Sequence, residues 1–104
     1  MKTASIKTKQ NIITILKEND NILKKFGIKK VGIFGSFVRE EQRDDSDVDL
    51  LAEFEKEKKT FDNFMNAAFF LEDVLGIPVE LVTEESISPY LKPHIMKEVE
   101  YVIS

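Results

Sequence analysis

Short apolar runs alternate with helix-like stretches along this chain, and this alternation limits the folds that it can adopt. The runs cover residues 30–34, 47–54 and 79–82, lengths typical of β-strands. Between them, apolar side chains recur at the spacing of amphipathic helices. The predicted order is α-β-α-β-α-β-α, an α+β or α/β layer with helices on one face of a small mixed sheet of three to four strands.

The helices are predicted from apolar spacing and from residues that start or stop a helix. The first covers about residues 8–25, and the polar segment 19–21 can divide it into two pieces. A short helix follows over about 36–42, and a longer one over Phe61–Leu75 ends at Gly76. The last helix follows Pro93, and its predicted buried side consists of Ile95, Val99 and Val102 or Ile103.

The length and composition of the chain limit its class. With 104 residues there is room for one hydrophobic core, so we expect a single domain over 1–104. The absence of cysteine excludes disulfides and thiolate zinc sites. No apolar run reaches the length of a signal peptide or a membrane span, so we expect a soluble cytoplasmic protein.

Charge is unevenly distributed along the chain. Residues 1–30 contain eight lysines and two acidic residues, whereas 40–58 contain nine of the nineteen acidic residues. The basic segment is compatible with nucleic-acid binding, but a helix with a solvated lysine face explains it more simply. The acidic segment is the more unusual feature, because its charges repel one another unless cations lie among them.

One stretch combines a phosphate-binding signal with a pair of carboxylates. Gly35 ends a strand where the backbone must turn, and Ser36 is the predicted N-cap of a helix whose free N–H groups can face a phosphate. Asp47 and Asp49 lie two apart on a strand, so both carboxylates point to one side. Such a pair favours a shared Mg²⁺, which also binds phosphate oxygens.

Two other motifs with similar residues are excluded. Asp45, Asp47 and Asp49 match positions 1, 3 and 5 of an EF-hand calcium loop. Position 6 is Leu50 instead of Gly, however, and position 12 is Lys56 instead of Glu. The chain also lacks the Gly-x-x-x-x-Gly-Lys-Ser/Thr pattern of P-loop NTPases.

These residues resemble the pattern of the DNA polymerase β-like nucleotidyltransferase superfamily, in its minimal branch, called MNT. The family pattern is Gly-Ser, a short helix with Arg, then Asp-x-Asp, and a third carboxylate on a later strand. The resemblance covers nearly the whole chain and implies the nucleotidyltransferase fold. It implies that Asp47 and Asp49 hold two Mg²⁺ ions, and that the NTP is bound by Gly35, Ser36, Arg39 and Ser46. For Arg39 there are two equal alternatives, a contact with phosphate or ribose and a purely structural role as an anchor of the acidic strand.

The chain departs from this family pattern at two positions. Glu40 follows Arg39 where the family usually has Gly. The third carboxylate is usually Asp, and the candidate on the third predicted strand is Glu80, which is one methylene longer. We expect Glu80 to be a metal ligand or the general base, although an exposed strand carboxylate without a role is the alternative.

The resemblance also implies an activity and a partner. MNT proteins commonly pair with a helical HEPN protein, a ribonuclease toxin, and resemble antitoxins that transfer AMP from ATP to a toxin tyrosine. The alternative is a non-catalytic protein of the same fold that neutralises its partner by occlusion. A homo-oligomer through the Phe61–Leu75 helix is a further hypothesis, because Phe70 is expected to point away from the apolar stripe of that helix.

Overall fold

The computed structural model describes residues 8–43 and 46–103. Within these residues, one mixed sheet has the strand order β3-β2-β1-β4. β1 runs antiparallel to β2 and β4, whereas β2 and β3 are parallel. The strands are β1 (Ile28–Phe34), β2 (Val48–Phe54), β3 (Val79–Thr83) and β4 (Glu100–Ile103). The predicted mixed sheet is therefore confirmed.

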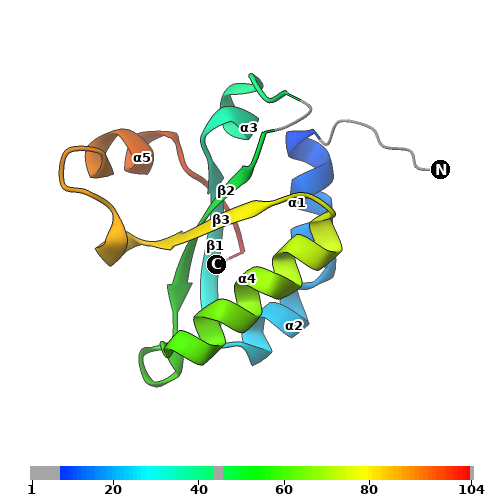
Figure 1. Cartoon of the computed structure of the whole chain (residues 1–104), viewed down its shortest axis with the longest axis vertical. Coiled ribbons are helices and arrows are strands. Elements are labelled where there is room, and N and C mark those ends of the chain that lie inside the picture. The colour runs from blue at the N-terminus through cyan, green and yellow to red at the C-terminus, as the bar shows by residue number, and fades with distance from the viewer. Residues whose placement is uncertain (1–7, 44–45, 104) are drawn as a thin grey trace.

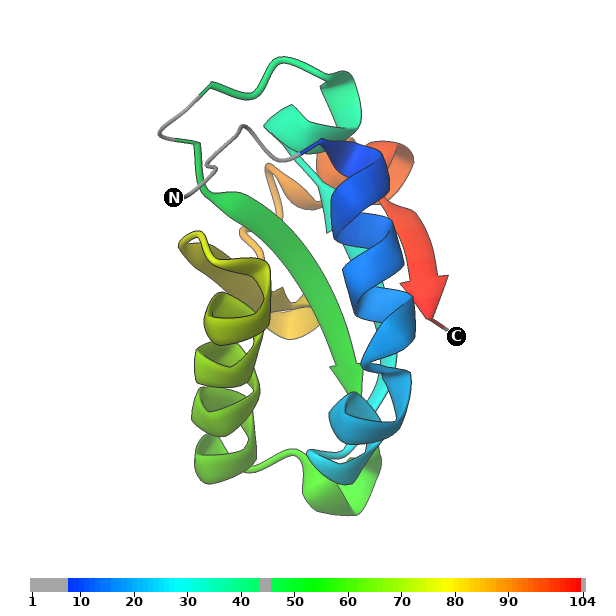
Figure 2. The ribbon, with the colours of Figure 1, turned by 90° about the vertical axis from the view of Figure 1, so that its right-hand side faces the viewer.

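Helices α1 (Lys9–Glu18), α2 (Asp20–Lys25) and α4 (Phe61–Leu75) cover one face of the sheet, as Figures 1 and 2 show. The short helix α5 (Lys92–Glu98) lies on the opposite side (Figure 2). Asn19 separates α1 from α2, within the segment that the sequence marks as a break. No helix of the described part of the chain combines the length and apolar character needed to cross a membrane.

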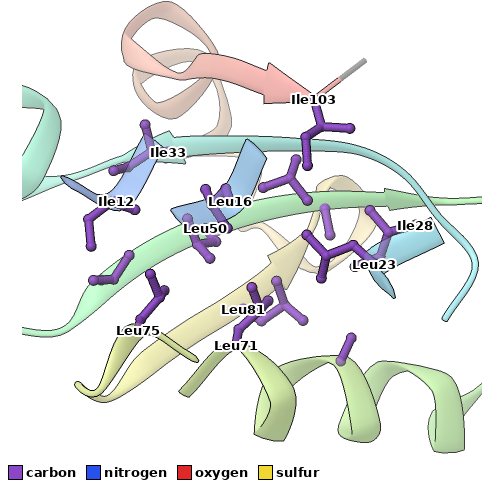
Figure 3. Packing of buried hydrophobic residues seen from close by; sticks show 14 of the residues in the cluster. Ile12, Leu16, Leu23, Ile28, Ile33, Leu50, Leu71, Leu75, Leu81 and Ile103 are labelled. Atoms are coloured by element: carbon purple, nitrogen blue, oxygen red, sulfur yellow. The ribbon is translucent and has the colours of Figure 1, made fainter. Parts of the chain in front are cut away.

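The hydrophobic core lies between the sheet and the three helices on its covered face. The largest contributions come from fully buried leucine and isoleucine side chains, each of which stabilises the fold by about 1.5–3 kcal/mol relative to an exposed position. Figure 3 shows these side chains meeting from the sheet and from the helices: Ile12, Leu16, Leu23, Ile33, Leu50, Leu71 and Leu75. The opposite face of the sheet is thereby left outside this core.

The C-terminal segment forms a strand, and the prediction that the last helix extends through it is wrong. Helix α5 ends at Glu98, and Val99 has extended backbone with φ −63° and ψ 136°. Residues 100–103 then pair with β1. The aromatic and β-branched side chains of this segment favour a strand, and pairing also covers the hydrogen-bonding groups along the open edge of β1.

The aromatic side chains of α4 do not follow the sequence prediction. Phe70 packs against the core, and its ring centroid lies 5.7 Å from that of Phe26, at the end of α2. The exposed aromatics of this helix are Phe61 and Phe69, at 75% and 60% exposure. Phe70 is covered because its ring packs against Phe26, the residue that follows α2, and against the core. A homo-oligomer through α4 stays a prediction, and Phe70 no longer supports it.

Candidate active site

Parallel pairing of β2 and β3 brings two carboxylates together. Asp49 and Glu80 are Cα partners in this register, so their side chains stand next to each other on one face of the sheet. Leu50 and Leu81, the next pair, belong to the core on the covered face. Asp49 and Glu80 therefore face the other side. Asp47 lies one residue before β2 and is exposed.

The turn after β1 packs directly against Asp49. Phe34, the last residue of β1, is the Cα partner of Asp49 in the antiparallel register. Gly35 follows with φ 80° and ψ −151°, a backbone conformation almost restricted to glycine. A Cβ atom on Gly35 would collide with the carboxylate of Asp49. Glycine therefore allows both the turn and its close contact with the acidic strand.

Helix α3 (Ser36–Arg39) is a single turn, and two sequence predictions about it are wrong. Its N-cap is Gly35, whose non-helical backbone precedes Ser36, so Ser36 is the first helical residue and does not cap it. The helix also ends before Gln42, because Glu40 adopts left-handed backbone with φ 59°. Glu40 stands where the family usually has Gly, and a side chain in this conformation costs about 1–2 kcal/mol.

Arg39 is held by two carboxylates outside the acidic strand. Its Nε lies 3.1 Å from Oε1 of Glu41, and its Nη1 lies 3.0 Å from Oε1 of Glu98, on α5. These contacts raise the pKa of Arg39, first through the hydrogen bond with Glu41 and then through Glu98. Glu98 was missed by the sequence reasoning, because no local pattern connects it with residues about sixty positions earlier.

Ser46 has a role in the loop before β2. The backbone N–H of Arg43 donates to Oγ of Ser46 at 2.7 Å, so this hydroxyl supports the entry into the acidic strand. Its predicted contact with the NTP stays a prediction. Asp44 and Asp45, which the sequence assigns to a polar loop, lie outside the described residues.

The carboxyl group of Asp49 has a pKa well above the usual value for an aspartate. Its pKa is raised from 3.8 to about 6, mainly because the group is partly buried. The negative charges of Glu80 and then Asp47 raise it further, whereas the charge of Arg39 lowers it. A cation bound among these carboxylates would relieve their repulsion and favour the ionised form of Asp49.

A pocket of about 280 Å³ opens beside the carboxylates. Asp49 and Glu80 form its acidic side, and Ser86 and Ser88 add hydroxyl groups. Its apolar walls come from the sheet, from α5 and from the segment between β3 and α5, namely Phe34, Val82, Ile87, Leu91 and Ile95. A pocket that is mainly apolar with a few convergent polar groups is suited to an organic ligand.

The carboxylates of this site suit Mg²⁺ better than a metal ion whose ligands all come from protein side chains. Among the described residues, no group of three or more His, Cys, Asp or Glu side chains is arranged to hold a metal ion. Mg²⁺ requires only one or two carboxylates, because phosphate oxygens and water complete its coordination. The adjacent Asp49 and Glu80 supply such ligands, and Asp47 adds a third carboxylate nearby.

Residues 10–102, which include both the turn and the carboxylates, match the family model of the nucleotidyltransferase domain. The chain belongs to this family. The nucleotidyltransferase is 37% identical over 100 residues to protein MJ1379 of Methanocaldococcus jannaschii, which is named provisionally as a protein adenylyltransferase. That alignment covers 93% of this chain and 100% of the relative. The predicted family and the predicted enzyme class are thus confirmed.

Solved structures agree with the fold of this nucleotidyltransferase. One, described provisionally as a minimal nucleotidyltransferase, has a TM-score of 0.80 at 29% identity and covers 93% of this chain and 98% of that chain. A Shewanella oneidensis complex of a tri-AMPylated HEPN toxin with an MNT antitoxin has a TM-score of 0.55. At 19% identity, with 90% of this chain and 67% of that chain covered, it shows the shared fold alone.

The raised pKa of Asp49 predicts a pH-dependent stability. Because the folded pKa of about 6 exceeds the unfolded value, protonated Asp49 stabilises the fold below about pH 4, and this contribution is lost as the pH rises through 6. The free energy of unfolding of Asp49→Asn, taken relative to wild type, should therefore be about 1 kcal/mol higher at pH 7.5 than at pH 4. This value is discounted for solvent screening. Urea unfolding in EDTA measures this difference.

The matched control for this prediction is Glu53→Gln. Glu53 lies on the same strand as Asp49 and is exposed, so its replacement removes a carboxylate without changing the site. This variant shows how much of the change in stability follows from removing any carboxylate of β2 outside the site. A difference between Asp49→Asn and wild type that is equal at both pH values would contradict the raised pKa.

Proposed function

We propose that this nucleotidyltransferase transfers AMP from ATP to a tyrosine hydroxyl of a HEPN-domain partner, and thereby acts as an antitoxin. The name of the Methanocaldococcus relative supports protein adenylylation as the reaction. The Shewanella complex supports the partner class, because there an MNT antitoxin is bound to a HEPN toxin that carries AMP. The Methanocaldococcus relative aligns with this chain over its whole length, and the Shewanella complex shares the fold described above.

The observation that carries the proposal is the contact of one carboxylate with two parts of the site. Asp49 is the direct neighbour of Glu80 on one side and packs against the Gly35 turn on the other. A nucleotide bound at the turn would therefore have its phosphates beside adjacent carboxylates. This is the arrangement that metal-assisted nucleotidyl transfer requires.

The carboxylates that would hold Mg²⁺ are Asp47, Asp49 and Glu80, and we propose that they bind two ions. When bound, Mg²⁺ neutralises charge on the triphosphate and makes the acceptor hydroxyl more acidic. Glu80 is exposed at the side of the pocket and is assigned as a metal ligand or as the base that takes the hydroxyl proton. The apolar walls of the pocket suit an aromatic group, which a tyrosine acceptor supplies.

Gly35, Ser36 and Arg39 are assigned to the triphosphate. The backbone of the turn lies against Asp49, so phosphates and carboxylates would meet at the end of β1. Arg39 has guanidinium N–H groups near the same turn and would offset negative charge there. Ser46, which supports the preceding loop, contributes to the position of Asp47 in this scheme.

The proposal is tested by incubating the protein with ATP, Mg²⁺ and a HEPN-domain protein encoded in the same genome. We expect intact-mass spectrometry to show addition of AMP to the partner, located on tyrosine by fragmentation and abolished by EDTA. Parallel reactions with CTP, GTP and UTP report the choice of base. Neutralisation of the partner by Asp49→Asn as complete as by wild type, without any modification, would support occlusion and reject the catalytic proposal.

A further inference from the structure

One carboxylate from α5 binds two of the groups assigned to the nucleotide. The backbone N–H of Gly35 donates to Oε2 of Glu98 at 2.8 Å. Nη1 of Arg39 donates to both oxygens of the same carboxylate, at 3.0 and 3.2 Å. Glu98, the last residue of α5, therefore connects the turn after β1 with the end of α3, although it lies about sixty residues later in the sequence.

The position of Glu98 follows from the register of β1 and β4. Ile33 and Glu100 are Cα partners in the antiparallel pair, so the same register, continued two residues after Ile33 and two residues before Glu100, would place Gly35 opposite Glu98. Glu98 belongs to helix α5, so the backbone hydrogen bonds between β1 and β4 do not extend to this residue. The side chain of Glu98 supplies the acceptor in its place. Gly35 is buried, so its backbone N–H needs an acceptor within the protein, and Glu98 supplies it.

Glu98 reaches Gly35 from a different side than the reacting groups. It comes from the β4 side of β1, whereas Asp49 packs against the turn from β2. The pocket beside Asp49 is lined by Ile95 of α5 and by Leu91 just before this helix, and Glu98 is not part of its lining. This contact thus fixes the turn and leaves the side that faces the carboxylates and the pocket available.

Arg39 is oriented by the same contact. Its Nη1 is bound by both carboxylate oxygens of Glu98, so the end of α3 is tied to α5 and the direction of the guanidinium is fixed. Without Glu98, Arg39 would keep its hydrogen bond with Glu41, two residues away on the exposed chain. A pair so close in sequence restricts the direction of the side chain much less than a contact with a second helix.

We propose that Glu98 is a positioning residue for nucleotidyl transfer, which holds the Gly35 turn and Arg39 in the geometry that the bound nucleotide requires. This role rests on the proposed function. It differs from a competitor role, in which the carboxylate of Glu98 occupies the place of a phosphate and must leave before ATP binds. Removing the charge of Glu98 should slow transfer if Glu98 is a positioning residue, and should tighten the binding of ATP if it is a competitor.

The test compares Glu98→Gln, Glu98→Asp and Glu41→Gln in the transfer assay. Glu98→Gln should lower kcat about 10- to 100-fold with a smaller change in KM for ATP, because misplaced binding groups mainly affect the reacting geometry. Glu98→Asp keeps the charge and should restore part of the rate. Glu41→Gln removes the other partner of Arg39 without touching Gly35, and should stay within about twofold of wild type.

Two outcomes, one in the rate and one in the affinity, would overturn the proposal. The first is a kcat of Glu98→Gln equal to that of Glu41→Gln, with both proteins folded by thermal melting. The second is tighter binding of Mg²⁺ and ATP by Glu98→Gln than by wild type, measured by calorimetry, which would assign the competitor role instead.

A measurement without catalysis separates this proposal from the proposed function. In ¹⁵N-labelled protein, Glu98→Ala should accelerate hydrogen exchange of the Gly35 amide at least about tenfold, whereas Glu41→Ala should leave it unchanged. Unchanged exchange in Glu98→Ala would reject the contact on which the proposal depends. If wild type transfers no AMP, the proposed function and the catalytic role of Glu98 both fail, while accelerated exchange still assigns Glu98 to the turn.

Discussion

Asp49→Asn is expected to lower the rate of AMP transfer by about 10³-fold or more, with the protein still folded. Asp49 is the carboxylate shared by the whole site, since it stands beside Glu80, lies near Asp47 and packs against the Gly35 turn. An amide has no charge with which to bind Mg²⁺ or to balance the charge that develops during transfer. Initial rates of AMP incorporation into the partner at saturating ATP measure the effect.

The control for this variant is again Glu53→Gln, two residues beyond Leu51 on β2. It removes a carboxylate from the same strand and should change the rate by less than about twofold. Circular dichroism and thermal melting establish that both variants are folded. Full activity of Asp49→Asn would show that this carboxylate has no part in the reaction, and the assignment of the site would be wrong.

Gly35→Ala is expected to have the largest effect of any single substitution on the turn itself. The new Cβ would collide with the carboxylate of Asp49, and the backbone at φ 80° and ψ −151° strongly disfavours any side chain. We expect a loss of about 2–4 kcal/mol in the free energy of unfolding, from backbone strain and overpacking together. Transfer should fall as well, because Asp49 must move. Urea unfolding measures the stability.

Gly76→Ala is the matched control for this prediction. Gly76 ends α4 with φ 73°, and a Cβ there would meet no atom within 4 Å. Its replacement therefore adds left-handed strain without a collision and should cost only about 1 kcal/mol, with little change in transfer. Equal losses of stability in the two alanine variants would show that the contact between Gly35 and Asp49 has no energetic importance.

Much of the fold was predictable because its signals are local. Helix α4 begins after Thr60 and ends at Gly76, as its apolar spacing and end residues indicated. The strand that carries Asp49 was predicted from a short apolar run of strand length, and its bounds differ from the prediction by one residue. The short spacing between Gly35 and the acidic pair also sufficed to indicate the family, which the match over residues 10–102 confirmed.

The C-terminal segment and α4 show where local patterns are insufficient. Val102 and Ile103 are compatible with a helix by spacing and with a strand by residue type, and the pairing of β4 with β1 decides between them. Phe70 lies off the apolar stripe of α4, yet Phe26 of a neighbouring segment covers it. In both cases the outcome depends on which surface a distant element offers, and periodicity within one element contains no information about that surface.

The sequence by itself determined the elements, the Gly-Ser turn and the Asp-x-Asp strand, because these depend on neighbouring residues. Only the tertiary structure decided that Glu80 is the Cα partner of Asp49, since strand register depends on how the whole sheet packs. It likewise decided that Glu98 binds Gly35 and Arg39 across more than fifty residues. Contacts of this kind form when separate elements meet, and no spacing along the chain specifies them.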